Sequence, residues 1–319
     1  MSTFTSPLAP QIERFLAHKL ALGFRYRREM AFLRELDGFA ALSNRDVISE
    51  TLVRDFLSRF GHSARPGRLT LIRQLALYLV LEDPRTFVPP RRFLGIRRKR
   101  TAIRVLSRDE ACRFLDACDR LPDTARYARR LIHGTALRLL LLTGLRQGEA
   151  IALCDQDVDL NQGIITVWNS KFGKSRFVPL APDLVGRLQS YRQDLADFIG
   201  TRRPGDAFFP CPDGHKPTCH SALYTSFRIA LTLAGIVHHG RGRGPRLHDL
   251  RHTFAVLRLL SWYEAGANLG NKLPLLATYL GHVSLATSQI YLHMTRDFVG
   301  EVTRRELDRF RDLITVAPS

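Results

Sequence analysis

The chain has 319 residues, 45% of them hydrophobic, which is enough apolar material for folded cores and excludes a disordered or fibrous protein. Lysine and arginine number 48 against 30 acidic residues, so the net charge is +18, and all but six of the basic residues are arginines. Because the guanidinium group binds phosphate with two parallel hydrogen bonds, this surplus favours nucleic acid as the partner.

Compartment signals are sparse. Residues 1–15 lack a charged start followed by an apolar run, so no signal peptide is predicted. The most apolar run, Leu139 to Leu142, is far too short to span a bilayer, and five cysteines do not form a secreted disulfide framework. We expect a cytoplasmic protein without membrane contact.

The first part of the chain is predicted to be helical. Apolar residues recur at helical spacing over 12–20, 32–40, 52–57 and 69–79, and Gly23, Gly61 and Pro84 follow three of these segments. Four short amphipathic helices can form a small bundle, which we place at 1–88. The alternative is an extension of one larger domain.

A basic segment follows this bundle. Residues 84–104 combine three prolines with a concentration of arginine, and we predict an interdomain linker at 89–104. Such a segment either lies along a phosphate backbone or is merely solvated, and composition does not decide between the two.

The second domain is predicted at 105–319. Ser107 and Glu110 have the spacing of a capping box, and helical patterns follow at 108–119, 128–143, 183–198, 221–234, 247–264, 272–280, 285–293 and 299–313. Residues 164–168 and 177–179 are typical of two strands around a turn. The predicted fold is therefore mainly α with a small antiparallel β-sheet.

Four short patterns in this domain carry candidate chemistry. They are Thr-Gly-Leu-Arg ending at Arg146, a His-x-x-Arg pair formed by His248 and Arg251, a Leu-Gly-His ending at His282, and Tyr291 nine residues later. His248 and Arg251 share one helix face because they are three residues apart. Taken alone, each pattern is more often a surface arginine, a polar helix face or a packing tyrosine.

In this order the patterns resemble the tyrosine recombinase (phage integrase) family, which includes transposon-borne and dimer-resolving recombinases. The resemblance covers about 105–315, and the four-helix part resembles the family's core-binding domain in size and helix count. It implies an N-terminal DNA-binding domain and a C-terminal catalytic domain. The implied activity is cleavage and rejoining of double-stranded DNA without cofactor or metal.

The resemblance also assigns roles to residues. Tyr291 would attack the scissile phosphate, form a 3′-phosphotyrosyl bond and release a 5′-hydroxyl, while Arg146 and Arg251 hold the non-bridging oxygens. A phenol has a pKa of about 10, so it needs a base, and developing charge on the phosphate needs fixed cations. Glu149, three residues after Arg146, would orient the site rather than react.

The remaining roles concern protons. His248 is the implied base for the phenol, and His282 would donate a hydrogen bond to the same phosphate. The family places a lysine in the β-turn to protonate the leaving oxygen. This chain offers Lys171 and Lys174 there, and Lys171 is the better match.

One departure concerns length. Arg251 and His282 are 31 positions apart, more than the family pattern implies, and the extra residues lie around 263–274. We expect a longer connection between two helices there, which puts the position of His282 in question. The segment also brings competing tyrosines, Tyr263 and Tyr279.

A zinc site is the other chemistry to weigh. Cys211, His215, Cys219 and His220 fall within ten residues, but their spacing is not that of a zinc site, so no metal is predicted.

The expected function is site-specific recombination or integration for a mobile element. The alternatives are a type IB topoisomerase-like enzyme and a catalytically silent DNA-binding accessory protein. The resemblance implies a homo-oligomer on DNA, which would be a tetrameric synapse. Accessory recombinases are further candidate partners. The segment 299–316 is either passed to a neighbouring subunit or caps its own.

Overall fold

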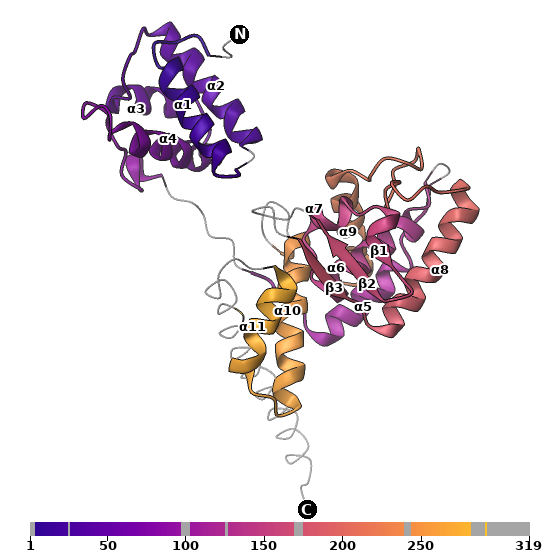
Figure 1. Cartoon of the computed structure of the whole chain (residues 1–319). Coiled ribbons are helices and arrows are strands. Elements are labelled where there is room, and N and C mark those ends of the chain that lie inside the picture. Colours follow the sequence, from indigo (N-terminus) through magenta and orange to yellow (C-terminus); the bar gives the residue numbers. More distant parts are fainter. Residues whose placement is uncertain are drawn as a thin grey trace, which may run out of the picture. The chain divides into compact units, whose positions relative to one another are not determined.

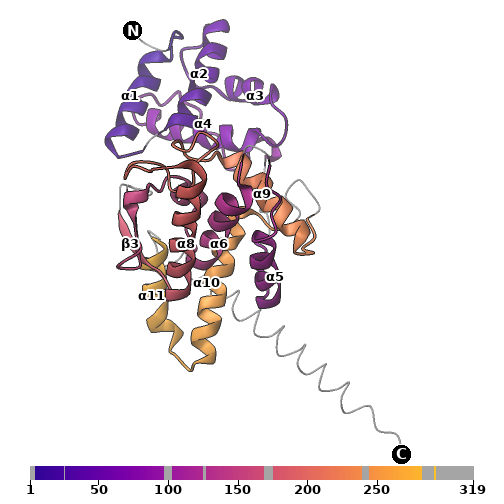
Figure 2. The ribbon, with the colours of Figure 1, turned by 90° about the vertical axis from the view of Figure 1, so that its right-hand side faces the viewer.

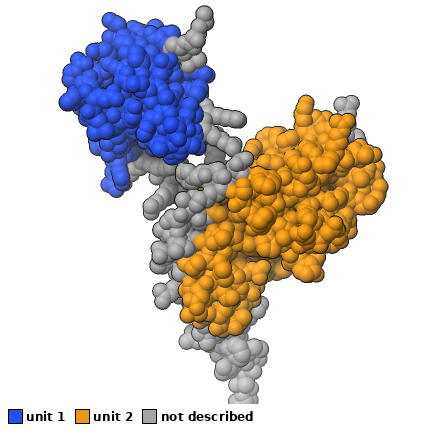
Figure 3. Space-filling view, in the orientation of Figure 1, with its two compact units in different colours: residues 1–100 blue, residues 101–319 orange. Residues whose placement is uncertain are grey.

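A computed structural model describes residues 4–24, 26–96, 103–124, 127–168, 175–238, 244–281 and 291, with Arg27 described by its backbone alone (Figure 1). The chain divides into two compact units, residues 1–100 and 101–319 (Figure 3). None of the helices among the described residues is long and apolar enough to cross a bilayer.

The first unit contains the four predicted helices. They are α1 (Ala9–Ala21), α2 (Arg27–Leu42), α3 (Glu50–Ser58) and α4 (Arg65–Leu79). Each turns its apolar stripe inward, so that Phe15, Leu33, Phe56 and Leu75 are buried in one core. The bundle is thus held by the helical periodicity that predicts it.

The segment after α4 packs on the same core. Phe93, in the short 3₁₀ helix η1 (Phe93–Gly95), is buried, and Arg73 donates a hydrogen bond to the carbonyl oxygen of Pro89. The first half of the segment predicted as a linker, residues 89–96, therefore belongs to the first unit, because Phe93 has apolar surface to bury. Residues 97–102 lie outside the described residues.

The second unit contains a three-stranded antiparallel sheet in the order β1-β2-β3. Its strands are β1 (Val158–Asp159), β2 (Ile164–Val167) and β3 (Arg176–Pro179). Ile165 pairs with Val178, and both side chains are buried on the inner face. The two-residue β1 was not predicted because it is too short to show alternation. The mainly α fold with a small antiparallel sheet is confirmed.

Figure 2 shows β3 at one edge of the second unit, with most of its helices on one side of that strand. The helices of this unit are α5 (Arg108–Cys118), the π-helical turn η2 (Arg130–Gly134), α6 (Thr135–Thr143), α7 (Gln147–Ile151), α8 (Pro182–Ile199), α9 (His220–Leu233), α10 (Leu247–Glu264) and α11 (Leu269–Leu280). The capping box of Ser107 and Glu110 is formed. The helix predicted at 128–143 begins instead with the π-helical turn. The helices predicted at 285–293 and 299–313, and the segment 299–316, lie outside the described residues, apart from Tyr291.

Helices α10 and α11, on either side of the segment where the extra length was expected, lie side by side (Figures 1 and 2). α10 ends at Glu264, α11 begins at Leu269, and the side chain of Asn268 caps α11. The predicted longer connection is therefore wrong. The extra residues belong to the helices, where Leu259 and Leu273 bury apolar surface in a shared cluster.

Gly144 lies where α6 packs against these two helices. It ends α6 with a φ of 65°, in the left-handed region that favours glycine. A β-carbon there would lie 2.6 Å from Cδ1 of Phe254 and 2.9 Å from Cδ2 of Leu280. The absence of a side chain therefore lets α6 approach both α10 and α11.

We expect Gly144→Ala to lower the free energy of unfolding of the second unit by about 2 kcal/mol, through backbone strain and overlap. Urea denaturation measures this. The control is Gly186→Ala, in α8, where a β-carbon meets nothing within 4 Å. It should stabilise by about 0.5 kcal/mol through helix propensity. Equal effects of the two substitutions would contradict the packing argument.

Candidate active site

Three arginines from three elements converge on the carboxyl end of α11. The Nε of Arg176 donates to the carbonyl of Tyr279 at 2.9 Å, Nη2 of Arg251 to that of Leu280 at 2.6 Å, and Nη2 of Arg146 to that of Gly281 at 3.1 Å. The last carbonyls of a helix have no partner within the helix and carry its negative dipole end. We call these three side chains and the turn 279–281 the arginine clamp.

Glu149 links two members of the clamp. Its Oε1 accepts from Nη1 of Arg146 at 2.6 Å, and its Oε2 accepts from Nη2 of Arg176 at 2.8 Å. Burial alone raises the pKa of Glu149, but the hydrogen bonds from Arg176 and Arg146 outweigh it and hold the pKa at about 2. Glu149 is therefore ionised at every physiological pH.

Arg251 is the most enclosed of the three cations, with 2% of the residue exposed. Its Nη1 also donates to the carbonyl of Gly144 at 2.8 Å, so two helix ends hold the guanidinium. Burial, followed by the charge of Arg146, lowers its pKa to about 10, which leaves it charged at neutral pH. A phosphate in contact with it would meet a fixed, poorly hydrated cation.

Tyr291 lies against this cation and is 1% exposed. Its hydroxyl lies 3.1 Å from Nδ1 of His252, and Arg251 is close enough for its charge to act on the phenol. Burial raises the pKa of the phenol, and the neighbouring Arg251 opposes that rise. A phenol held between a guanidinium and an imidazole can lose its proton to the imidazole while the guanidinium stabilises the phenolate oxygen.

Two histidines stand one helical turn apart on α10. The rings of His248 and His252 meet edge to face, with centroids 4.8 Å apart. Partial burial and the charge of Arg251 lower the pKa of His248, while burial and then His248 lower that of His252 to about 4. Both imidazoles are therefore neutral at neutral pH and able to accept a proton.

The structure brings together four of the predicted site residues, Arg146, His248, Arg251 and Tyr291. Arg146 and Tyr291 each influence the pKa of Arg251, and the charge of Arg251 lowers the pKa of His248. Lys171, Lys174 and His282 lie outside the described residues.

Sequence reasoning missed Arg176 and the role of His252. Arg176 had a readable signal, because it precedes the inward-facing Val178 by two residues on β3 and so shares its face. His252 follows His248 by four positions, which places both on one face of α10.

The competing tyrosines are engaged elsewhere. Tyr279 stacks on Phe254, with ring centroids 5.5 Å apart, and burial raises its pKa to about 12. Tyr263 is exposed at the end of α10.

The Cys–His segment is built as a surface loop. The thiol of Cys211 donates a hydrogen bond to Oδ1 of Asp213, and Nδ1 of His215 lies 3.1 Å from a carboxylate oxygen of Asp206. The thiol of Cys219 caps α9. Across the ranges that the structure describes, no three such side chains are grouped to hold a metal ion.

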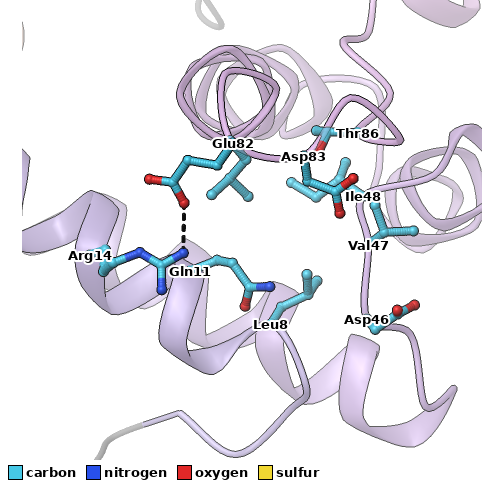
Figure 4. Close-up of a pocket in the computed structure, with 10 residues that line it drawn as sticks. Leu8, Gln11, Arg14, Asp46, Val47, Ile48, Glu82, Asp83 and Thr86 are labelled. Carbon is cyan, nitrogen blue, oxygen red and sulfur yellow. Dashed lines mark hydrogen bonds and ion pairs between the residues drawn. The ribbon is translucent and has the colours of Figure 1, made fainter.

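The first unit has a hollow of its own, with a volume of about 220 Å³ between α1 and the segments around Ile48 and Asp83 (Figure 4). Its carboxylates already have partners. Glu82 pairs with Arg14 at 2.7 Å, and Asp83 pairs with Arg85 at 2.8 Å. This hollow therefore offers no concentration of uncompensated charge.

Glu149→Gln should lower the free energy of unfolding by about 2 kcal/mol at pH 7, because it leaves two guanidiniums close together without a counter-charge. The folded-state pKa of about 2 lies below the ordinary 4.5, so the stabilisation is present above pH 4.5 and is lost as pH falls towards 2. Urea denaturation between pH 7 and about pH 3.5 should show the two proteins converging. Glu264→Gln, which breaks an exposed pair with Arg108, is the control. A difference independent of pH would contradict this assignment.

Residues 104–297 match the Phage integrase family. An integrase/recombinase of Sinorhizobium fredii, y4rB, is 31% identical over 320 residues, which cover 98% of this chain and 99% of that protein. The tyrosine recombinase XerD of Pseudomonas aeruginosa is 34% identical over 167 residues, 51% of this chain and 49% of that one.

Among solved structures, the fold is similar to that of the XerH site-specific recombinase bound to its palindromic difH substrate in a post-cleavage complex. The TM-score is 0.61 at 22% identity, covering 85% of this chain and 77% of that one. The family match spans more than half of the chain, and the similarity to y4rB runs along nearly all of it. The chain belongs to the phage integrase family of tyrosine recombinases.

Proposed function

We propose that this protein is a site-specific DNA recombinase that cleaves and rejoins double-stranded DNA through a phosphotyrosine at Tyr291. The observation that carries the proposal is the position of the Tyr291 hydroxyl, which lies 3.1 Å from Nδ1 of His252 and within the electrostatic reach of Arg251. A buried phenol that only packs needs neither a charged cation nor a neutral base as its neighbour.

The reaction follows from this cluster. The phenol oxygen bonds to phosphorus, the bond from phosphorus to the 5′-oxygen breaks, and the DNA 3′ end stays on the protein. Arg146 and Arg251 neutralise the two non-bridging oxygens while negative charge builds up on them. Religation is the reverse step, with the 5′-hydroxyl of the same or another strand as the nucleophile. No hydrolysis is needed, because the covalent bond conserves the energy of the phosphodiester.

Two protons move in each direction. The leaving 5′-oxygen takes one from Lys171, for which Lys174 is the alternative donor, while His282 donates a hydrogen bond to the phosphate. The phenol gives the other proton to a histidine on α10. The family pattern predicts His248 as the acceptor, whereas the contact of the Tyr291 hydroxyl with Nδ1 of His252 favours His252.

The partners follow from the chemistry. The cations that stabilise the phosphate are side chains, so we propose a reaction that needs no metal and proceeds in the presence of EDTA. Exchange between two duplexes requires several protomers, as in a tetrameric synapse, in the compartment that holds the DNA. The name of the Sinorhizobium relative suggests integration or recombination, and a mobile element is the source we propose for the DNA.

Tyr291→Phe should abolish covalent attachment to DNA while leaving binding affinity within about twofold, because only the nucleophilic oxygen is lost. Nicked fragments of the DNA flanking the coding region serve as suicide substrates, and sequencing the DNA that remains attached after denaturation identifies the site. Absence of any adduct with the native protein would support an accessory DNA-binding role instead. Relaxation of supercoils by a monomer without strand exchange would support a topoisomerase.

A pH profile separates the two histidines. The wild-type cleavage rate should stay level from about pH 8 to pH 6 and fall only as the base is protonated, since the pKa of His252 is about 4. In His252→Gln we expect a rate about 100-fold lower at pH 7 that rises about tenfold per pH unit, because the phenol must then ionise unaided. His248→Gln should be slower without gaining that slope. The slope appearing in His248→Gln instead would make His248 the acceptor.

A further inference from the structure

We propose that Arg176 is a positioning residue that holds the guanidinium of Arg146 in the orientation needed to bind the scissile phosphate. This inference rests on the recombinase function proposed above, and it concerns a residue that does not itself touch the DNA. Arg176 would act through Glu149 and through the turn at the end of α11.

The first observation is the way Arg176 is bound. Its Nη1 and Nη2 donate to the two carboxylate oxygens of Glu149 at 3.1 and 2.8 Å, while Nε donates to the carbonyl of Tyr279 at 2.9 Å. The Arg176 and Glu149 side chains are 10% and 9% exposed. A lysine has no second arm with which to make this set of bonds, so the geometry specifically requires a guanidinium.

The second observation is that Arg146 is held at both ends by groups that Arg176 also holds. One end of its guanidinium donates to Oε1 of Glu149 at 2.6 Å, and the other donates to the carbonyl of Gly281 at 3.1 Å. Glu149 and the turn 279–281 are the two supports of Arg146. Arg176 binds each of them, so a shift of Arg176 changes both supports.

The third observation is the fit between Arg176 and the turn. Gly281 has a φ of 67°, and a β-carbon on it would lie 3.1 to 3.2 Å from Nη1, Cδ and Cζ of Arg176. The guanidinium therefore fills the space that a side chain would take. The residue after Gly281 in the sequence is the predicted phosphate ligand His282.

These contacts predict what happens without Arg176. The Glu149 carboxylate loses two of its donors and is free to rotate towards Arg146, which can then engage both of its oxygens. A guanidinium drawn onto a carboxylate is withdrawn from phosphate. A displacement of about 1 Å in such a group costs on the order of 100-fold in rate.

The test compares Arg176→Lys with Arg202→Lys as a matched control. Arg202 is equally enclosed in the same unit, with side-chain exposures of 7% for Arg202 and 15% for its partner Asp155. It also donates to the backbone carbonyls of Gly214 and Ala207. It supports the loop at 201–207 and has no contact with the arginine clamp among the described residues. A merely structural loss would be shared by both variants.

The readout is the single-turnover cleavage rate on the site identified by covalent capture, measured on an ordinary duplex and on one with a methylphosphonate at the scissile position. The methylphosphonate lacks one charged non-bridging oxygen, so its cleavage needs less charge neutralisation by Arg146. We expect Arg176→Lys to cleave the ordinary duplex about 30-fold more slowly and the methylphosphonate within about threefold of wild type, with unchanged DNA affinity. Arg146→Ala is the positive control for this pattern, and Arg202→Lys should cleave both duplexes as wild type does.

Each other outcome has a distinct meaning. Equal losses on the two duplexes, or no loss, would overturn the positioning role while leaving the recombinase function standing. A loss that disappears instead on a duplex with sulfur at the bridging 5′ position, which needs no general acid, would attribute the effect of Arg176 to protonation by Lys171 and would also overturn the proposal. Absence of cleavage by the native protein would reject the proposed function itself.

Discussion

The site depends on the carboxyl end of one helix. Three consecutive carbonyls, of Tyr279, Leu280 and Gly281, are each hydrogen-bonded to a different arginine, and the three arginines come from β3, α10 and the start of α7. Helix ends leave such carbonyls without partners, and buried cations need acceptors. Each requirement is met by the other, so these hydrogen bonds hold the pieces of the site together.

This arrangement explains how the protein tolerates so much positive charge in one place. Arg146, Arg176 and Arg251 would repel one another in a medium of low dielectric constant, and the lowered pKa of Arg251 reflects both its burial and its charged neighbours. One carboxylate, Glu149, and the carbonyls at the ends of α6 and α11 offset part of that repulsion. The remaining imbalance is an electrostatic preference for an anion, and a phosphodiester supplies one.

The sequence predicted the elements whose signals are periodic. Amphipathic spacing predicted α1–α4, and it placed α10 at 247–264, the bounds observed. The π-helical start of the 128–143 segment and the two-residue β1 were not predicted, because each is too short to show a periodic pattern of apolar residues. Among site residues, local motifs revealed Arg146, His248 and Arg251. Strand alternation places Arg176 on the face of Val178, but it does not reveal the tertiary contacts of Arg176 with Glu149 and Tyr279.

The α10–α11 pair shows why the clamp would tolerate a change in chain length. Arg251 lies near the start of α10 and Leu280 at the end of α11, so the two residues that meet are at the open end of an antiparallel hairpin. Residues added before Glu264 and after Leu269 would move the connection outward and leave that end unchanged. They would have to extend both helices by similar rises, since lengthening only one would leave apolar surface without a partner of the kind that Leu259 and Leu273 have in the shared cluster. The length of this segment is therefore weakly constrained, whereas the hydrogen bonds of Arg251 to Gly144 and Leu280 constrain its two ends.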